Sequence, residues 1–493
     1  MNRQRVIGRL ICCVTGLVIA STCFVSVAPA SEPTRAEVAE TLRKACEFYS
    51  ENCAKHGGYV WRYSKDLTLS EGEAATDADT IWVQPPGTPA IGEVYLNAYQ
   101  TTGDPYYLDA AIETARSLVA GQLQSGGWYY AIYFSPEERA QRGYRDNSDF
   151  RPSRRRVDTR NKTVIDDDTT PSAIRFLARV DRELRFEDER IHDAVEFALD
   201  ALLVAQYPNG GWMHNYNHHP TEHSIDAFPV LKAGYPESWS RQWLNDWPGV
   251  YFLNDNISGS MLETMLVAWE VYGDERYLDS ARRTGEFFIL AQMPEPQPAW
   301  AQQYDVSMHP CWDRKMEPPA ISGLESQDTI EVLLLLYRMT GEERFLEPVP
   351  AAIDYLRRSL LPDGRLARFY ELKTNRPLYV TSEYELTYDS SDTPSHYGFE
   401  FDSRLDQFQT ELERLQREGP GEPRASVDDR IEQHVLQVMA AMDERGGWLE
   451  QVGLRAFPQA REGAYLSETF IENTTLLINY LRFADGLKQA PMN

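Results

Sequence analysis

Cysteine is scarce in this sequence, and its placement suggests neither a metal site nor a disulfide framework. There are six cysteines in 493 residues, and three of them lie within the first 30. Cys46, Cys53 and Cys311 follow at spacings unlike those of metal-binding motifs. Cys46 and Cys53 could still pair outside the cytoplasm. The sequence also lacks a His-Glu-x-x-His motif, so it offers no recognisable zinc site.

Positive charge is the second shortage. Lysine and arginine number 49 against 75 acidic residues, which gives a formal net charge of −26. A chain this acidic is a poor partner for nucleic acids or for anionic membrane surfaces. Beyond the N-terminus there is no apolar run long enough to cross a bilayer, so we expect no membrane insertion.

The N-terminus has the features of an export signal. Three arginines precede an apolar run at residues 10–20, and Ala28-Pro29-Ala30 follows. This order predicts a cleavable signal peptide over residues 1–30, cut after Ala30, and a secreted or periplasmic protein. Attachment of a lipid at Cys23 is the alternative, but the three residues before it form a poor acylation signal.

An internal repeat organises the rest of the chain. Each copy contains a helical segment, a turn, a Tyr-Leu or Phe-Leu pair, a second helical segment and a Gly-Trp turn or its equivalent. Apolar residues recur every three to four positions, which indicates helices with one buried face. The pattern predicts about a dozen helices in a mainly α fold, an incomplete or closed α/α toroid. The copies span residues 96–128, 175–212, 266–300 and 334–370.

Long non-repeating segments interrupt this pattern, at residues 129–162, 213–253 and 379–425. Loops of such length in a compact domain are usually functional or disordered. We therefore divide the chain into N-terminal helical repeats of the toroid (31–160) and a catalytic region (161–493) with an insertion at about 379–425. We expect the protein to be a monomer.

The Gly-Trp turns have two interpretations. A left-handed glycine can end a helix there, and the tryptophan can fasten the turn to the core. Alternatively, some of these rings line a sugar-binding groove, as the 12% aromatic content of an acidic, exported chain suggests. On the second interpretation, Trp212 and Tyr304 are candidate substrate-binding residues.

Two acidic clusters precede predicted helices. Asp166-Asp167-Asp168 stands before one helix, and Asn254-Asp255-Asn256 stands before the next helix but one. Asp and Asn are good helix N-caps, and we assign that role to Asp168. Capping does not account for three adjacent carboxylates and a second cluster one repeat later. Carboxylate and amide oxygens from two loops are the ligands that Ca²⁺ prefers, so we predict a calcium site.

Basic residues stand out in two aromatic-rich loops. Residues 299–326 contain Arg314 and Lys315, and residues 368–380 contain Arg368 and Arg376. In an acidic protein, arginines placed among aromatic side chains suggest clamps for carboxylates.

Taken together, these segments resemble the family 10 pectate lyases, also called pectic acid lyases. The resemblance runs from about residue 163 to residue 380. It is carried by TVIDDDTTPSAIRFLARV, by AQYPNGGW followed by YFLNDN, by WAQQYD with DRKMEPPAISG, and by RFYELKTNRP. It implies an α/α toroid that cleaves polygalacturonate, the main acidic polysaccharide of pectin, by anti β-elimination with Ca²⁺.

The resemblance also implies roles for individual residues. The calcium ligands fall on Asp166, Asp167 and Asp255, and the catalytic base falls on Arg314. Arg376 matches a substrate-binding arginine, with Arg368 as the weaker match.

The sequence departs from the family pattern in two places. The family usually has Asn where Asp167 stands. It also has a lysine just before the catalytic arginine, where this chain has Trp312. Lys315 is the candidate to replace that lysine in substrate binding.

Two other functions remain open. A glycoside hydrolase on the same kind of toroid would use Asp166 and Asp255 as acid and base, without calcium. A non-catalytic carbohydrate-binding protein is the other alternative. A terpenoid cyclase is disfavoured, because Val164 stands where the first aspartate of its Asp-x-Asp-Asp motif belongs.

Overall fold

The computed structural model describes residues 32–152, 158–421 and 430–487. The predicted signal peptide, residues 1–30, lies outside the described residues. Over the described ranges the chain forms thirteen α-helices, which confirms the predicted mainly α fold. They are α1 (Arg35–Phe48), α2 (Thr88–Thr102), α3 (Pro105–Val119), α4 (Pro136–Gln141), α5 (Thr169–Glu183), α6 (Glu189–Ala205), α7 (Ile257–Tyr272), α8 (Glu275–Ala291), α9 (Gly323–Thr340), α10 (Val349–Arg358), α11 (Leu405–Glu418), α12 (Ile431–Ala441) and α13 (Ser467–Leu487).

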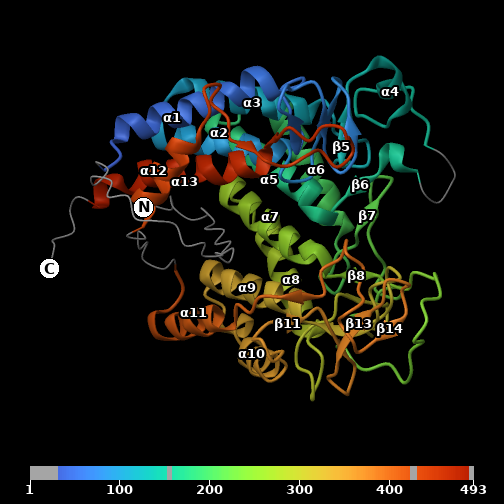
Figure 1. Ribbon diagram of the computed structural model, residues 1–493. Coiled ribbons are helices and arrows are strands. Elements are labelled where there is room, and N and C mark those ends of the chain that lie inside the picture. Colours follow the sequence, from blue (N-terminus) through green and yellow to red (C-terminus); the bar gives the residue numbers. More distant parts are fainter. Residues whose placement is uncertain (1–31, 153–157, 422–429, 488–493) are drawn as a thin grey trace.

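The helices form two layers of an α/α toroid. The inner layer runs α13, α2, α5, α7, α9, each helix packed against the next. Each inner helix is covered by an outer one, α1, α3, α6, α8 and α10 in the same order, while α11 packs on α9 and α10. Figure 1 shows α7 between α5 and α9, with α11 standing apart from α13. The series therefore continues across residue 160 without a break.

Burial distinguishes the two layers. Almost every residue in the first three turns of α7 is buried, whereas α8 alternates buried and exposed positions. A helix that is apolar on all sides belongs inside a fold, and an amphipathic helix belongs on its surface. The repeated pairing of a buried helix with an amphipathic one is thus the physical basis of the ring.

The strands are short and connect the loops at the ends of the helices. One sheet has the order β16 (Leu449–Glu450), β17 (Ala464–Leu466), β1 (Arg62–Ser64), β2 (Ser70–Glu71), β3 (Ala75–Thr76). A second has the order β10 (Ala320–Ser322), β12 (Phe369–Glu371), β13 (Pro377–Val380), β14 (Leu386–Thr387). Four two-stranded pairs are β4 (Thr80–Trp82) with β5 (Ala131–Tyr133), β6 (Thr163–Val164) with β7 (Asn215–Tyr216), β8 (Tyr251–Phe252) with β9 (Gln303–Tyr304), and β11 (Leu366–Ala367) with β15 (Glu400–Phe401).

A hydroxyl group near the start of an inner helix repeatedly fastens the turn that precedes it. The Thr170 hydroxyl accepts from the backbone N–H of Trp128 at 3.0 Å and donates to the Trp128 carbonyl at 3.2 Å. Ser326 makes the same pair of bonds to Trp300, at 3.0 and 3.2 Å. We call this arrangement a hydroxyl bracket. It satisfies two buried backbone groups at once and sets the position of the helix start.

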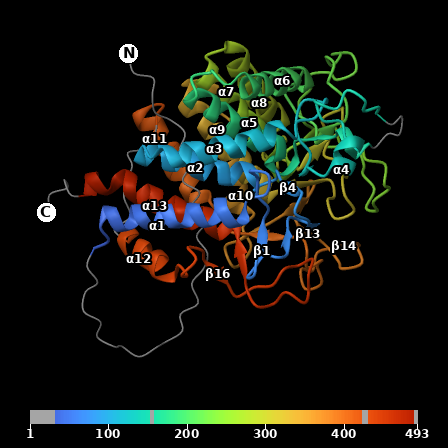
Figure 2. The ribbon, with the colours of Figure 1, turned by 90° about the horizontal axis from the view of Figure 1, so that it is seen from above.

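The two ends of the described chain close on each other. Figure 2 shows α1 and α13 side by side, and the two helices are packed together. In the sheet that joins them, β1 pairs antiparallel with β17, with Tyr63 opposite Tyr465. The Ser467 hydroxyl donates to the carbonyl of Val60 at 2.6 Å. The N-terminal and C-terminal segments are therefore parts of one packed unit.

Three details bear on the earlier expectations. Cys46, Cys53 and Cys311 are buried free thiols, so the pairing of Cys46 with Cys53 is not formed. The insertion at 379–425 is partly regular, because it supplies β14, β15 and α11. None of the described helices has the length and apolar character that crossing a bilayer requires.

Candidate active site

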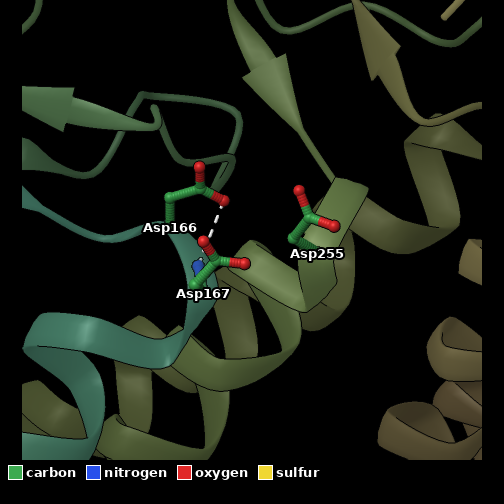
Figure 3. A group of neighbouring side chains, drawn as sticks. All are labelled: Asp166, Asp167 and Asp255. Carbon is green, nitrogen blue, oxygen red and sulfur yellow. Dashed lines mark hydrogen bonds between the residues drawn. The ribbon is translucent and has the colours of Figure 1, made fainter. Parts of the chain in front are cut away.

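Two turns of the same unusual shape present the acidic cluster. Asp166 and Asp167 lie on the 3₁₀ turn Asp166–Asp168 before α5, and Asp255 lies on the turn Asn254–Asn256 before α7. Asp167 and Asp255 both have left-handed backbones, with φ of 51° and 49°. A non-glycine residue held in this conformation costs about 1–3 kcal/mol, and such residues cluster at functional sites. Figure 3 shows the three carboxylates converging from the two turns.

The geometry of this cluster fits a divalent cation. Asp166, Asp167 and Asp255 each offer an oxygen, and the three oxygens lie within 4.8 Å of one another. Burial, and then the charge of Asp255, raises the pKa of Asp166 to about 7. Burial, and then the charges of Asp166 and Asp255, raises the pKa of Asp167 to about 7. A Ca²⁺ ion would hold these hard oxygen donors together, because its charge would offset their mutual repulsion.

The third aspartate has a role different from the predicted one. Asp168 occupies the N-cap position of α5, but its side chain makes no capping hydrogen bond. It forms an ion pair with Arg175, whose guanidinium also donates to the Thr264 hydroxyl at 3.0 Å. The capping prediction is therefore wrong: because Asp168 has a left-handed backbone, its side chain serves to join α5 to α7 instead.

Arg314 lies next to the acidic cluster. Its guanidinium is 3.3 Å from Asp255 and donates from Nε to Glu317 at 2.8 Å. The Arg314 backbone N–H also donates to Glu317, at 3.0 Å. Burial by itself would lower the pKa of Arg314, but the hydrogen bonds and charge of Glu317, with the charge of Asp255, raise it overall. The structure thus brings the predicted base and the predicted metal ligands into direct contact.

Arg368 joins the same network through Tyr397. Its guanidinium lies 4.2 Å from the centre of the Tyr397 ring and 3.4 Å from Glu325. The Tyr397 hydroxyl donates to Glu317 at 2.8 Å, and the Arg314 guanidinium lies 5.8 Å from the same ring. Tyr397, from the insertion, therefore ties Arg368 to Arg314.

Arg376 and Lys315 are exposed and lie on tyrosine rings of the β13–β14 hairpin and the residues after it. The Arg376 guanidinium is 3.4 Å from the centre of the Tyr388 ring, and the Lys315 amine is 3.2 Å from that of Tyr384. Of the two arginines proposed for substrate binding, Arg368 is the one connected to Arg314, although the sequence favoured Arg376.

The proposed sugar-binding roles of Trp212 and Tyr304 are wrong. Both side chains are completely buried. The Trp212 indole donates to the Thr284 hydroxyl at 3.0 Å, and the Tyr304 hydroxyl donates to the carbonyl of Ala291 at 2.7 Å. The structural interpretation of the Gly-Trp turn is the one that holds here, because each ring fills the space between a turn and an outer helix.

Sequence reasoning also missed His214, which connects the two aspartate turns. Its backbone carbonyl accepts from the N–H of Ile165 at 2.8 Å, and its Nε2 lies 3.0 Å from the Asn254 amide oxygen. Its ring stacks on Phe252 with centres 3.7 Å apart, and burial lowers its pKa. A neutral imidazole thus links the two turns that carry the acidic cluster. The sequence offered one signal for the role of His214, namely its position two residues after Trp212 of the Gly-Trp turn.

Comparison with known proteins supports a relation to the pectic lyases. The family described as pectic acid lyase matches residues 140–227, a segment that includes Asp166 and Asp167 but neither Asp255 nor Arg314. No curated protein matches the chain.

Solved structures that resemble the chain come from several enzyme classes. A mutant family 10 polysaccharide lyase from Cellvibrio cellulosa, in complex with trigalaturonic acid, is 16% identical, with a TM-score of 0.43 over 67% of this chain and 98% of that one. A GH76 α-mannanase from Bacteroides thetaiotaomicron is 10% identical, with a TM-score of 0.45 over 93% and 98%. A D-mannose isomerase is 13% identical, with a TM-score of 0.45 over 92% and 100%.

The helix order, the acidic cluster and the match to the pectic acid lyase family together define the class of the protein. The chain is an α/α toroid, and the family match supports a carbohydrate-processing enzyme. Within that class, the matched segment supports a pectic lyase-like family.

Proposed function

We propose that the protein is a lyase that cleaves polygalacturonate, or a related uronate polymer, by calcium-assisted anti β-elimination. One observation carries this proposal: the guanidinium of Arg314 lies 3.3 Å from Asp255, within a cluster of three carboxylates suited to a divalent cation. Elimination from a uronate needs positive charge near its C6 carboxylate and a base near C5. The site offers a place for both.

The residues would divide the reaction as follows. A calcium ion held by Asp166, Asp167 and Asp255 would supply positive charge to the substrate carboxylate and so favour loss of the C5 proton. Arg314 takes that proton on a guanidine nitrogen. The electrons of the C5–H bond form the C4–C5 double bond, and the C4–O bond breaks with its electron pair leaving on oxygen. Arg368 is buried and pairs with Glu325, so it would add positive charge near the substrate carboxylate through its contact with Tyr397.

Glu317 positions Arg314 and also sets its proton affinity. It accepts from both the side chain and the backbone of Arg314, so it fixes the direction of the guanidinium. The same negative charge holds a proton on Arg314, which must lose that proton before it can act as a base. We therefore expect activity to increase with pH over the alkaline range.

A direct assay tests the proposal. The protein, without residues 1–30, is incubated with polygalacturonate in calcium or in EDTA, and the ultraviolet absorbance of unsaturated uronate ends is followed. We expect absorbance to grow only with calcium, and not at all for Arg314→Ala. A wild-type protein that binds calcium and gives no unsaturated product from a panel of uronate polymers would overturn the proposal.

A glycoside hydrolase is the second candidate, favoured by one observation. Asp166 and Asp167 have pKa values raised to about 7, as a general acid requires near neutral pH. A hydrolase would release saturated reducing ends, in EDTA as well as in calcium. The same reaction mixtures, analysed for reducing ends and for absorbance, therefore separate the two functions.

A further inference from the structure

A hollow of about 350 Å³ lies between two segments that the proposed reaction does not use. One wall is residues 235–241 of the long loop between β7 and β8. The other wall is residues 371–374, at the turn that follows β12. Its lining includes Tyr235, Glu237, Trp239, Arg241, Glu371 and Lys373.

The cations at this hollow are held on aromatic rings. The Lys373 amine is 5.6 Å from the centre of the Tyr235 ring. The Arg241 guanidinium is 5.5 Å from the Trp239 ring and 5.6 Å from the Tyr388 ring. Such contacts leave the outer hydrogen-bond donors of the cation directed toward other groups. Aromatic faces and charged donors thus meet in one concave site.

The charges in the hollow are not all compensated within the protein. Glu371 forms an ion pair with Arg241 and accepts from the Tyr388 hydroxyl at 2.7 Å. Although burial raises the pKa of Glu371, its hydrogen bonds with Thr374, Tyr388 and Arg241 lower it overall, so this carboxylate is charged. Within the described parts of the chain, no carboxylate lies at ion-pair distance from Lys373. Lys373 therefore offers its charge to a ligand, even though Glu237 also lines the hollow.

The hollow is structurally joined to the segment that carries Arg314. The Trp312 indole donates to the Ser240 carbonyl at 2.7 Å, and the Trp243 indole donates to the Asp313 carbonyl at 2.7 Å. These two bonds flank Arg241 on the loop and come immediately before Arg314 on the other segment. The loop wall of the hollow is therefore bonded to the two residues that come immediately before Arg314.

We propose that the hollow is a second binding subsite, which takes a uronate unit of the same polymer away from the bond that is cleaved. Lys373 and Arg241 donate to the sugar carboxylate, while Trp239 and Tyr235 contact the sugar ring. This inference rests on the proposed function for the identity of the ligand. The long loop between β7 and β8 then takes part in recognising the length of the substrate polymer.

The test compares Trp239→Ala and Lys373→Met with the wild-type protein on galacturonate oligomers of three to eight units. We expect KM for the longest oligomers to rise about tenfold in each variant, the effect of losing one charged or aromatic contact. The KM values for the shortest oligomers stay unchanged, because such oligomers do not reach the hollow. Trp247→Ala, an exposed tryptophan on the same loop, and Arg357→Met, on α10, are the controls.

Two results would overturn the subsite. One is an unchanged KM at every length, and the other is an equal loss at every length, which indicates a general disturbance of the site. A separate arm measures binding of the octamer by calorimetry in EDTA, where calcium-dependent cleavage does not take place, and reducing ends are assayed afterwards to confirm that the octamer is intact. If the wild-type protein yields no unsaturated product, the proposed function fails, and this arm still decides the subsite: affinity lost in Lys373→Met supports it, and equal affinity overturns it.

Discussion

Arg314 donates to Glu317 and at the same time lies 3.3 Å from Asp255, so one guanidinium joins two buried or partly buried carboxylates. Glu317 is fully buried and Asp255 belongs to the acidic cluster. The consequence is that orientation and proton affinity of Arg314 are set by the same contacts. Substitutions that keep or remove the charge at position 314 or 317 separate these two effects.

Replacing Arg314 by lysine should remove most of the activity while leaving the fold and the acidic cluster in place. A lysine keeps the charge but cannot make the paired contacts with Glu317. We expect kcat to fall by about 10²–10⁴, the usual contribution of a positioned base. Initial rates of unsaturated product give the measurement, with Arg357→Lys on α10 as the control. Activity within a factor of two of wild type would exclude Arg314 as the base.

Replacing Glu317 by glutamine should move the pH dependence of the reaction. The glutamine can still accept a hydrogen bond from Arg314, but it no longer stabilises the positive charge. Because Glu317 raises the pKa of Arg314, its neutralisation lowers that pKa. We expect the alkaline rise of kcat/KM to shift to lower pH by about one unit or more. A profile with unchanged midpoint and lower amplitude would instead indicate a purely orienting role.

Calcium binding should depend on Asp167 and Asp255 but not on Asp168. Calorimetric titration with CaCl₂ should show at least about a tenfold loss of affinity in Asp167→Asn and in Asp255→Asn. Asp168→Asn is the matched control, since this neighbouring carboxylate pairs with Arg175. Equal affinity in all three variants would place the ion elsewhere or exclude it.

Without calcium, the acidic cluster should destabilise the protein at neutral and alkaline pH. The folded-state pKa values of Asp166 and Asp167 are raised to about 7 from 3.8. Between pH 4 and 7 the folded state therefore holds protons that the unfolded state has lost, and stability from these groups falls as pH rises. In EDTA at pH 8, Asp167→Asn should unfold about 1–2 °C above wild type, because about 1–2 kcal/mol of repulsion between carboxylates is relieved.

The comparison must be made at two pH values to identify the cause. At pH 5 the wild-type carboxylates are largely protonated, and the difference in Tm between Asp167→Asn and wild type should shrink. Saturating calcium at pH 8 should narrow or reverse the difference, because the wild-type protein binds calcium more tightly and so gains more stability from it. A difference in Tm that does not change with pH would point to packing rather than charge.

Trp212 should prove to be a structural residue. Trp212→Ala removes a fully buried indole and should lower the free energy of unfolding by about 3–5 kcal/mol. Chemical denaturation measures this loss, and KM of the remaining folded enzyme should stay close to the wild-type value. Trp247→Ala, on an exposed ring, should change stability by less than about 0.5 kcal/mol. A normal stability for Trp212→Ala with a raised KM would restore the sugar-binding role.

The fold and the acidic cluster were accessible from the sequence because their signals are local. Apolar spacing revealed the helix pairs, and Asp167 and Asp255 each precede a helix in equivalent turns. Equivalent places in neighbouring repeats lie side by side, so their meeting followed from the repeat. The role of Asp168 did not follow, because its left-handed backbone is set by the turn and its partner Arg175 lies on the helix itself.

Contacts between distant loops were not accessible. The connection of Arg368 with Arg314 depends on Tyr397, which reaches the site from an insertion without any repeat. The burial of Trp212 and Tyr304 was also ambiguous, because a tryptophan beside a Gly-Gly turn can face inward or outward. The outer helix behind each turn, and not the turn itself, decides which of these occurs.

The pairing of β1 with β17, and of α1 with α13, has a consequence for how the chain acquires its structure. The N-terminal segment meets its partner only when the last helix, Ser467–Leu487, has been made. Contacts of such high sequence separation form slowly. A nascent chain would therefore remain incompletely assembled until its C-terminal region emerges. Truncation before α13 should leave α1 without its cover, and would expose the chain to aggregation and proteolysis rather than yield a smaller working ring.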